Sequence, residues 1–144
     1  RQHNILIGER TAEQVKINVG SAISKLENPP ENYPVLGRDL MTGHPKEVIV
    51  TYSEIAGCLD KSIGKIEDAI HTALNQTPPE LSADIFKTGI YLAGGGALLR
   101  GLDIRISLRT KLPVHIAEDP LHAVAKGTAI ALKNIDRFPF LMHG

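Results

Sequence analysis

The strongest constraint on the fold lies in the last third of the chain, where a strand pattern, three glycines and a helix pattern follow one another. Residues 90–93 (IYLA) form a continuous apolar run, which is typical of a strand buried in a parallel sheet. Residues 94–96 are all glycine, and residues 113–117 have the pattern of a second short strand. Between them, apolar side chains recur at the spacing of one helix: Leu98, Leu99, Leu102 and Ile106. The sequence therefore predicts an α/β fold in which the glycines turn a strand into a helix.

A second helix pattern lies near the start of the chain. Thr11 and Gln14 have the spacing of a capping box, in which each side chain satisfies a backbone N–H of the first turn. The apolar residues that follow share one helical face: Ala12, Val15, Val19, Ala22, Ile23 and Leu26. A pair of prolines then ends the pattern, so we expect one helix over residues 11–28. The apolar residues 4–7 before it fit either a strand or the start of this helix.

The middle of the chain predicts a hairpin followed by a long helix. Residues 46–52 are rich in β-branched side chains and follow a strong turn, so we expect them to pair with residues 33–40 as antiparallel strands. Thr51 and Glu54 form a second capping box. Apolar residues then trace one helical face: Ile55, Leu59, Ile63, Ile66, Ile70 and Leu74. Two prolines end this helix and open a short one, roughly residues 79–86.

The end of the chain predicts a last helix and an apolar tail. Asp119 before Pro120 has the order of an N-cap residue and a first-turn proline, so we expect a helix over residues 120–133. Its apolar side chains are expected to be buried in part: Leu121, Val124, Ala125, Ile130 and Leu132. The apolar residues 138–142 either fold back on this helix or dock on a partner.

Composition excludes several functional classes. The 144 residues include 16 Lys and Arg and 16 Asp and Glu, so the chain lacks the basic excess of general nucleic-acid and anionic-membrane binders. No apolar run approaches the roughly 20 residues of a membrane span. The single cysteine, Cys58, cannot form a disulfide within the chain, and we expect it to be a small buried apolar residue. The lack of disulfides favours a reducing, cytoplasmic compartment for the protein. The six histidines lack metal-ligand spacing, so we predict no metal site.

The three glycines are the main chemical signal. At a strand-to-helix turn they let backbone N–H groups approach a ligand, and the helix N-terminus favours negative charge, so a nucleotide is the natural guest. The alternative is a tight turn with no ligand. Glu13 and Lys16 lie one helical turn apart, either as a solvated surface pair or as a polar clamp on a nucleobase or ribose. Neither a nucleophile elbow nor a Cys–His pair is evident, so we assign no catalytic residue.

Several linked motifs resemble, in the same order, the MreB family of bacterial actins that determine rod shape. Residues 7–17 (IGERTAEQVKI) resemble the nucleotide-contacting helix of that family, and residues 92–103 (LAGGGALLRGLD) resemble its adenosine-binding glycine motif. Residues 113–121 (PVHIAEDPL) and 124–128 (VAKGT) resemble the segment that follows. The predicted hairpin fits as well, so the resemblance covers nearly the whole chain.

The resemblance implies an actin-like fold of two lobes around one nucleotide, with this chain forming most of the second lobe. An inner, ribonuclease-H-like α/β subdomain would consist of residues 1–27 and 81–144 and form the adenosine side of the cleft. Residues 28–80 would form a small α+β outer subdomain. Because the chain begins at Arg1 without a methionine, we expect it to be a piece of a longer protein.

The resemblance also implies a ligand, ATP, and its contacts. The residues at its purine and ribose would be Glu13, Lys16, Gly94, Gly95, Gly96 and Ala97. No aspartate of the chain has glycine two residues on, the Asp-x-Gly form with which actin-like ATPases hold phosphates and Mg²⁺. Hydrolysis needs phosphate positioning and charge neutralisation together, so we expect the Mg²⁺ site elsewhere in the protein and this chain alone to be inactive.

For the full-length protein the family implies a cytoskeletal function at the inner face of the cell membrane. It would bind ATP, assemble into protofilaments, meet a membrane-bound adaptor and wall-synthesis proteins, and organise cell-wall synthesis, with membrane contact through other parts of the protein. The alternative is another ATPase of the actin and Hsp70 superfamily, a plasmid-segregating filament or a chaperone domain. The short insert at residues 28–80 favours the MreB family, because a chaperone would carry a larger helical insert there.

Overall fold

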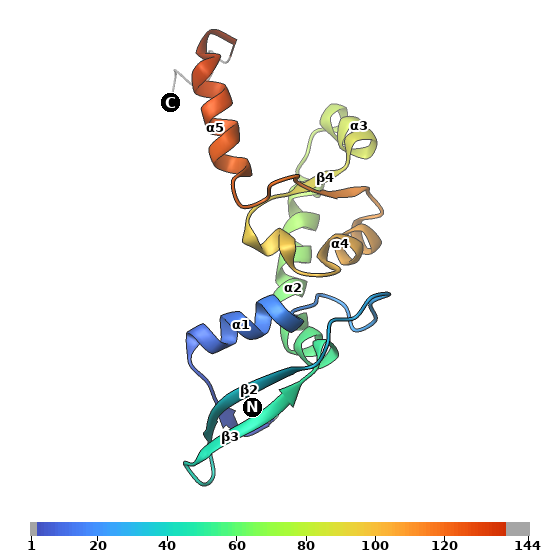
Figure 1. Cartoon of the computed structure of the whole chain (residues 1–144). Coiled ribbons are helices and arrows are strands. Elements are labelled where there is room, and N and C mark those ends of the chain that lie inside the picture. The colour runs from blue at the N-terminus through green and yellow to red at the C-terminus, as the bar shows by residue number, and fades with distance from the viewer. Residues whose placement is uncertain (1–2, 138–144) are drawn as a thin grey trace.

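A three-stranded antiparallel sheet forms one end of the molecule in the computed structural model, which describes residues 3–137 (Figure 1). The central strand pairs with both others, and the strands are β1 (Ile5–Leu6), β2 (Tyr33–Asp39) and β3 (Pro45–Val50). The predicted hairpin is confirmed, and residues 4–7 contribute a strand rather than a helix start. The register sets Val35 opposite Val48 and Tyr33 opposite Val50, which places four apolar side chains on one face.

Helix α1 (Glu9–Val19) packs on that face and is shorter than predicted. It begins after Gly8 without a side-chain cap, so the expected capping box at Thr11 is wrong. It also ends nine residues before the expected position at residue 28. Gly20 has extended backbone because the next residue, Ser21, pairs in parallel with Arg100, 79 residues away. A long-range pairing has overridden the local helix pattern.

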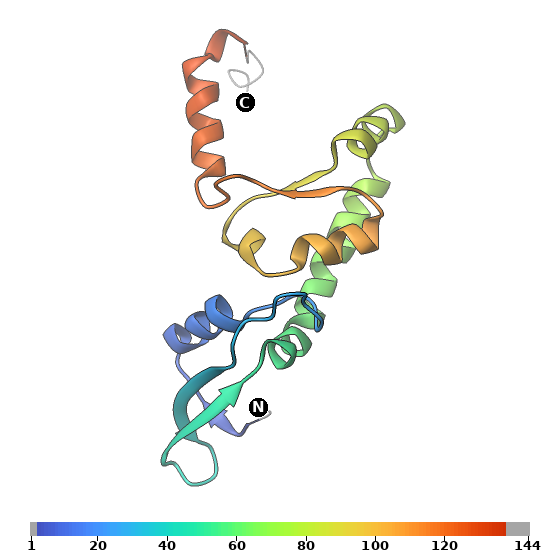
Figure 2. The same ribbon diagram turned by 45° about the vertical axis from the view of Figure 1, so that its right-hand side comes forward.

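Helix α2 (Tyr52–Asn75) runs from the sheet to the other end of the molecule (Figures 1 and 2). Its predicted capping box is confirmed: the Glu54 backbone N–H donates to Thr51 Oγ1 at 3.3 Å, and the Thr51 N–H donates to Glu54 Oε2 at 2.8 Å. Near the sheet, Tyr52 and Ile55 pack against the cluster of Val15, Val19, Val35 and Val50. Further along, Ile63 belongs to a second buried cluster with Ala22, Leu102 and Ile106.

The other end of the molecule contains the predicted parallel strands, but the helix after the glycines is divided. Ile90 lies opposite Val114 in a two-stranded parallel sheet. The elements here are α3 (Pro79–Thr88), β4 (Ile90–Leu92), the 3-10 helix η1 (Gly95–Leu98), α4 (Leu102–Thr110) and β5 (Val114–Ile116). A single helix through residues 98–106 is wrong because Arg100 pairs with Ser21 and Gly101 adopts a left-handed conformation (φ 73°) between η1 and α4.

Helix α5 (Ala123–Lys133) stands apart from the rest of the molecule in both ribbon views, and η2 (Ile135–Arg137) follows it (Figures 1 and 2). It begins at residue 123 rather than 120, because the Pro120 carbonyl accepts a hydrogen bond from the Gly94 N–H at 2.6 Å and keeps that residue in a turn. The predicted partial burial of its apolar side chains is wrong, since all are exposed: Leu121, Val124, Ala125, Ile130 and Leu132. The tail at residues 138–142 lies outside the described residues.

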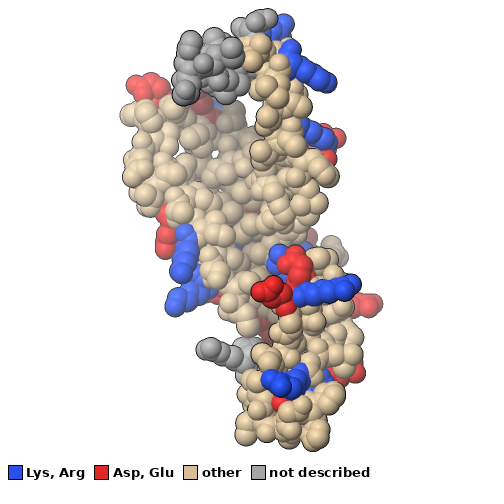
Figure 3. Space-filling view, turned by 90° about the vertical axis from the view of Figure 1, so that its left-hand side faces the viewer, with Lys and Arg blue, Asp and Glu red and all other residues tan. Residues whose placement is uncertain are grey.

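Two further observations concern the surface. Cys58, expected to be buried, is exposed, because it lines an open cavity beside Ile55 and is not covered by packed side chains. The face drawn in Figure 3 has a broad area without charged side chains in its upper half. Within the described residues, no helix combines the length and apolar character needed to cross a membrane.

Candidate functional site

The glycine loop is folded by its own backbone. Gly94 has φ 82°, a conformation that glycine adopts without the steric cost of a side chain. Its carbonyl accepts a hydrogen bond from the Ala97 N–H at 3.1 Å, which closes the first turn of η1. Ala97 is buried, while Gly95 and Gly96 are exposed. The loop therefore presents the backbone of two glycines on a short, internally bonded turn.

Open space lies beside Gly95 and Gly96. A Cβ built on Gly96 would meet no atom within 4 Å, and one on Gly95 would meet only Leu121 Cδ2 at 3.5 Å, an ordinary contact. Neither residue has a positive φ. By contrast, a Cβ on Gly20 would lie 2.1 Å from the Lys16 carbonyl oxygen. The contacts of the described chain require glycine at position 20 but do not themselves require it at positions 95 and 96.

Glu13 and Lys16 form an ion pair on the exposed side of α1. Lys16 Nζ lies 2.8 Å from Glu13 Oε2, and about half of each side chain is accessible to water. Exposed pairs of this kind contribute only about 0–1 kcal/mol to stability. Stability therefore does not explain the pair, and either side chain can exchange its partner for a ligand at little cost.

Arg100 connects α1 with the glycine loop. Its Nη1 donates hydrogen bonds to the Ile17 carbonyl at 3.1 Å and the Gly20 carbonyl at 3.4 Å, both at the end of α1. Its own carbonyl accepts a hydrogen bond from the Ala22 N–H at 2.8 Å. The two groups of predicted site residues thus lie on elements that Arg100 joins. Sequence reasoning missed this role, because no local pattern relates positions 83 residues apart.

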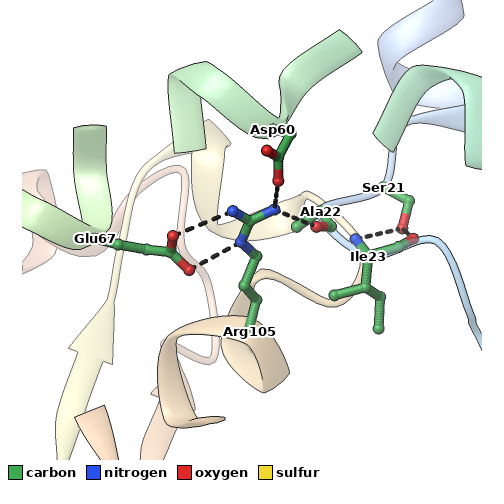
Figure 4. Close-up of polar contacts among 6 residues, drawn as sticks. All are labelled: Ser21, Ala22, Ile23, Asp60, Glu67 and Arg105. Carbon is green, nitrogen blue, oxygen red and sulfur yellow. Dashed lines mark hydrogen bonds and ion pairs between the residues drawn. The ribbon is translucent and has the colours of Figure 1, made fainter. Parts of the chain in front are cut away.

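A second arginine, Arg105, contacts the segment that follows α1 (Figure 4). Arg105 on α4 forms two hydrogen bonds to Glu67, at 2.8 and 3.1 Å, and one to Asp60 at 2.8 Å, both on α2. It also donates to the Ala22 carbonyl at 3.1 Å. The hydrogen bonds to Glu67, followed by those to Asp60, raise the pKa of Arg105 above its usual range. A cavity of about 310 Å³ beside it is lined by Ser24, Ser53 and Gly57, among others.

Asp119 lies next to the loop but does not cap α5. Its carboxylate accepts hydrogen bonds from Lys126 Nζ at 2.7 Å and contacts His122 Nδ1 at 3.0 Å. These hydrogen bonds, from Lys126 first and His122 second, lower the pKa of Asp119. The carboxylate is engaged in the first turns of α5, so we assign it no ligand.

The arrangement is that of an actin-like lobe. Two structures of MamK, each 22% identical to this chain, superpose with TM-scores of 0.62 and 0.64 over 85% and 84% of its length. The fold expected from the resemblance is therefore confirmed. The chain belongs to the MreB/Mbl protein family, whose sequence model matches residues 1–139.

Named relatives agree with this assignment. The cell shape-determining protein Mbl of Bacillus cereus is 46% identical over 139 residues, covering 96% of this chain and 41% of that protein. The cell shape-determining protein MreB of Escherichia coli K12 is 43% identical over 144 residues, covering the whole chain and 40% of that protein. The chain thus spans about two fifths of the length of these relatives. The alternative, a plasmid-segregating filament or chaperone, finds no support among them.

Solved structures of the family give the closer geometric match. MreB5 of Spiroplasma citri bound to AMPPNP has a TM-score of 0.88 and 40% identity, covering 94% of this chain and 40% of that one. The same protein bound to ADP also has a TM-score of 0.88, with 39% identity, covering 99% of this chain and 42% of that one.

Proposed function

We propose that this chain forms the adenosine side of an ATP site in a longer bacterial actin-like protein. Glu13 and Lys16 would contact the base or ribose from α1, and the backbone at residues 94–97 would lie against the nucleoside from the opposite side. The exposed, internally bonded glycine turn that follows β4, with open space beside Gly95 and Gly96, carries the proposal. The family relative solved with AMPPNP and with ADP supports a nucleotide as the occupant.

The proposal extends to the full-length protein. It would bind ATP with Mg²⁺ held outside this chain, assemble into protofilaments and act at the inner face of the cell membrane with an adaptor and wall-synthesis proteins. The cell shape-determining names of the relatives support this function. Residues 1–27 and 81–144 would form the inner subdomain and residues 28–80 the outer one, although within this chain α1 shares its buried cluster with the hairpin.

Valine substitution in the glycine loop of the full-length protein tests the site. Gly95→Val and Gly96→Val should abolish ADP binding measured by titration calorimetry, because a branched side chain would fill the space left for the ligand. Gly64→Val is the matched control, since a Cβ there also meets nothing within 4 Å but lies on α2, away from the loop. Unchanged affinity in both loop variants would overturn the proposed site.

The isolated 144-residue chain should not hydrolyse ATP. It has no Asp-x-Gly loop with which to hold phosphates and Mg²⁺. Phosphate release above a no-protein control, retained through successive purification steps, would contradict this expectation.

A further inference from the structure

We propose that Arg100 is a positioning residue of the nucleotide site. It holds α1 and the glycine loop in fixed relation, so that Glu13 and Lys16 on one element and residues 94–96 on the other meet the same nucleoside. This inference rests on the proposed function and adds to it the residue that keeps the two sides of the site together.

The path from the glycine loop to Arg100 is short and rigid. The Leu99 N–H donates to the Gly96 carbonyl at 3.1 Å, so η1 passes directly into the segment that meets α1. Leu99 then packs against Gly20, where a built Cβ would approach Leu99 Cδ1 to 3.0 Å. A shift of α1 relative to this segment would therefore be transmitted to the loop.

The guanidinium of Arg100 sits at the C-terminal end of α1. The last carbonyl groups of a helix lack partners within it and carry partial negative charge, which a cation stabilises. Arg100 supplies that cation together with N–H donors to the carbonyls of Ile17 and Gly20. Lys16 immediately precedes Ile17, so these hydrogen bonds of Arg100 act directly beside one of the proposed ligand contacts.

The side chain and the backbone of Arg100 have separable tasks. The pairing with Ser21 and the hydrogen bond from the Ala22 N–H use only the backbone of Arg100. These contacts remain when the side chain is replaced. Arg100 is an exposed residue, so we expect removal of its side chain to leave α1 and the loop folded but less firmly oriented. A purely structural role would instead appear as a loss of stability.

The test uses the full-length protein and ADP as the probe. Arg100→Met should weaken ADP binding at least about tenfold, because a site whose supporting contacts are lost becomes too loose to bind well. The melting temperature of the ligand-free variant should stay within about 2 °C of wild type, which for a large protein is a small free-energy change. Arg100→Lys, which keeps the charge, should recover part of the affinity. Arg109→Met, an exposed arginine on α4, is the matched control and should bind as wild type.

Coupling to Lys16 sharpens the test. If Arg100 acts through α1, Arg100→Met should add little to the loss already caused by Lys16→Met, because residues that act through one another are not additive. The positioning role is overturned if Arg100→Met binds ADP with wild-type affinity. It is also overturned if the loss of ADP affinity accompanies a fall in melting temperature and adds fully to the loss caused by Lys16→Met. If Arg100→Met does not fold, Arg100→Gln gives the same readouts. Failure of the wild-type protein to bind ADP would overturn the proposed function and this inference together. If Gly95→Val loses ADP binding while Arg100→Met binds ADP as wild type does, only this inference is overturned.

Discussion

Helices α2 and α5 carry the same kind of sequence pattern and lie in opposite environments. Both have apolar residues at helical spacing, yet Ile63 of α2 is 3% exposed while Val124 of α5 is 73% exposed. α2 passes both buried clusters of the molecule, and no residue of α5 is buried. The pattern indicates that a helix has a face to bury, but it does not indicate whether the partner lies in the same chain.

The difference arises from what surrounds each helix. α2 is contacted by α1, by the hairpin and by α4, and Arg105 adds hydrogen bonds across to Glu67 and Asp60 (Figure 4). α5 extends away from β5 and contacts chiefly its own continuation, η2. We therefore expect substitutions around α2 to change the stability of this chain and substitutions on α5 to leave it nearly unchanged.

The largest effect is expected at Ile106, which is 1% exposed in the cluster beside α2. Ile106→Ala should lower the free energy of unfolding of the chain by about 2–5 kcal/mol, measured by urea denaturation, because it leaves a cavity among packed side chains. The matched control is Ile130→Ala on α5, where 58% of the residue is already exposed. Equal losses in the two variants would remove the contrast between the two regions.

Removal of the Arg105 side chain should have the next largest effect. Arg105→Met leaves Glu67, whose side chain is only 12% exposed, without its cationic partner. Hydrogen bonds to charged groups contribute roughly 1.5–3 kcal/mol each, so we expect the free energy of unfolding to fall by about 3 kcal/mol. Arg109→Met on the same helix serves as the control in the same urea experiment. An effect no larger than that of the control would show that the network contributes nothing to holding α2 and α4 together.

The capping box at the start of α2 should give a smaller effect. Thr51→Ala removes the oxygen that accepts the Glu54 N–H, and loss of such a cap costs about 1 kcal/mol. Thr72→Ala replaces an exposed threonine inside the same helix and should be neutral or slightly stabilising. If the two variants unfold at the same urea concentration, the cap does not define the start of α2.

The capping box also illustrates what sequence can predict. The Thr51 and Glu54 pair and the hairpin depend on residues close together in the sequence, and both were predicted correctly. The two parallel strands are confirmed as well, but the burial that the apolar run at residues 90–93 indicated is wrong, since no residue of β4 is buried and Tyr91 is 68% exposed. The ends of α1 and the division after η1 were not predicted, because both depend on the pairing of Ser21 with Arg100 across 79 residues. Burial on α5 failed for a related reason, since its apolar side chains have no cover within the described chain.

The candidate site likewise has one part that the sequence predicted and one part that it did not. The family motifs identified Glu13, Lys16 and the three glycines from short stretches of sequence, and their contacts with a nucleotide stay a prediction. The link between them was not predictable, because the Arg100 side chain meets carbonyl groups that carry no side-chain signature.

The contribution of the hairpin turn to stability can be tested by measuring unfolding at different pH values. Hydrogen bonds from Lys46 and from the N–H groups of Thr42 and Met41 lower the pKa of Asp39 to about 2 from an ordinary value of 3.8. A carboxyl with a depressed folded pKa stabilises the fold fully above its unfolded pKa and loses that effect as the pH falls toward the folded value. The urea midpoint of Asp39→Ala should therefore lie below wild type at pH 7, and the gap should close between about pH 4 and 2. A gap between Asp39→Ala and wild type that stays constant over this pH range would contradict the assignment.

The smallest effect is expected on α5, where it is most informative. Replacing Ile130 and Leu132 together by serine removes apolar side chains that are 58% and 66% exposed. Surface changes of this kind usually alter stability by less than about 0.5 kcal/mol, so the urea midpoint of the 144-residue chain should hardly move. Exposed apolar side chains also promote association, so the double variant should sediment as a smaller species than wild type at high concentration. In the full-length protein the same double variant should melt several degrees lower if other parts of the protein cover this helix. A loss above about 1 kcal/mol in the chain alone would mean that α5 packs on the body of the chain after all, and the contrast with α2 would fail.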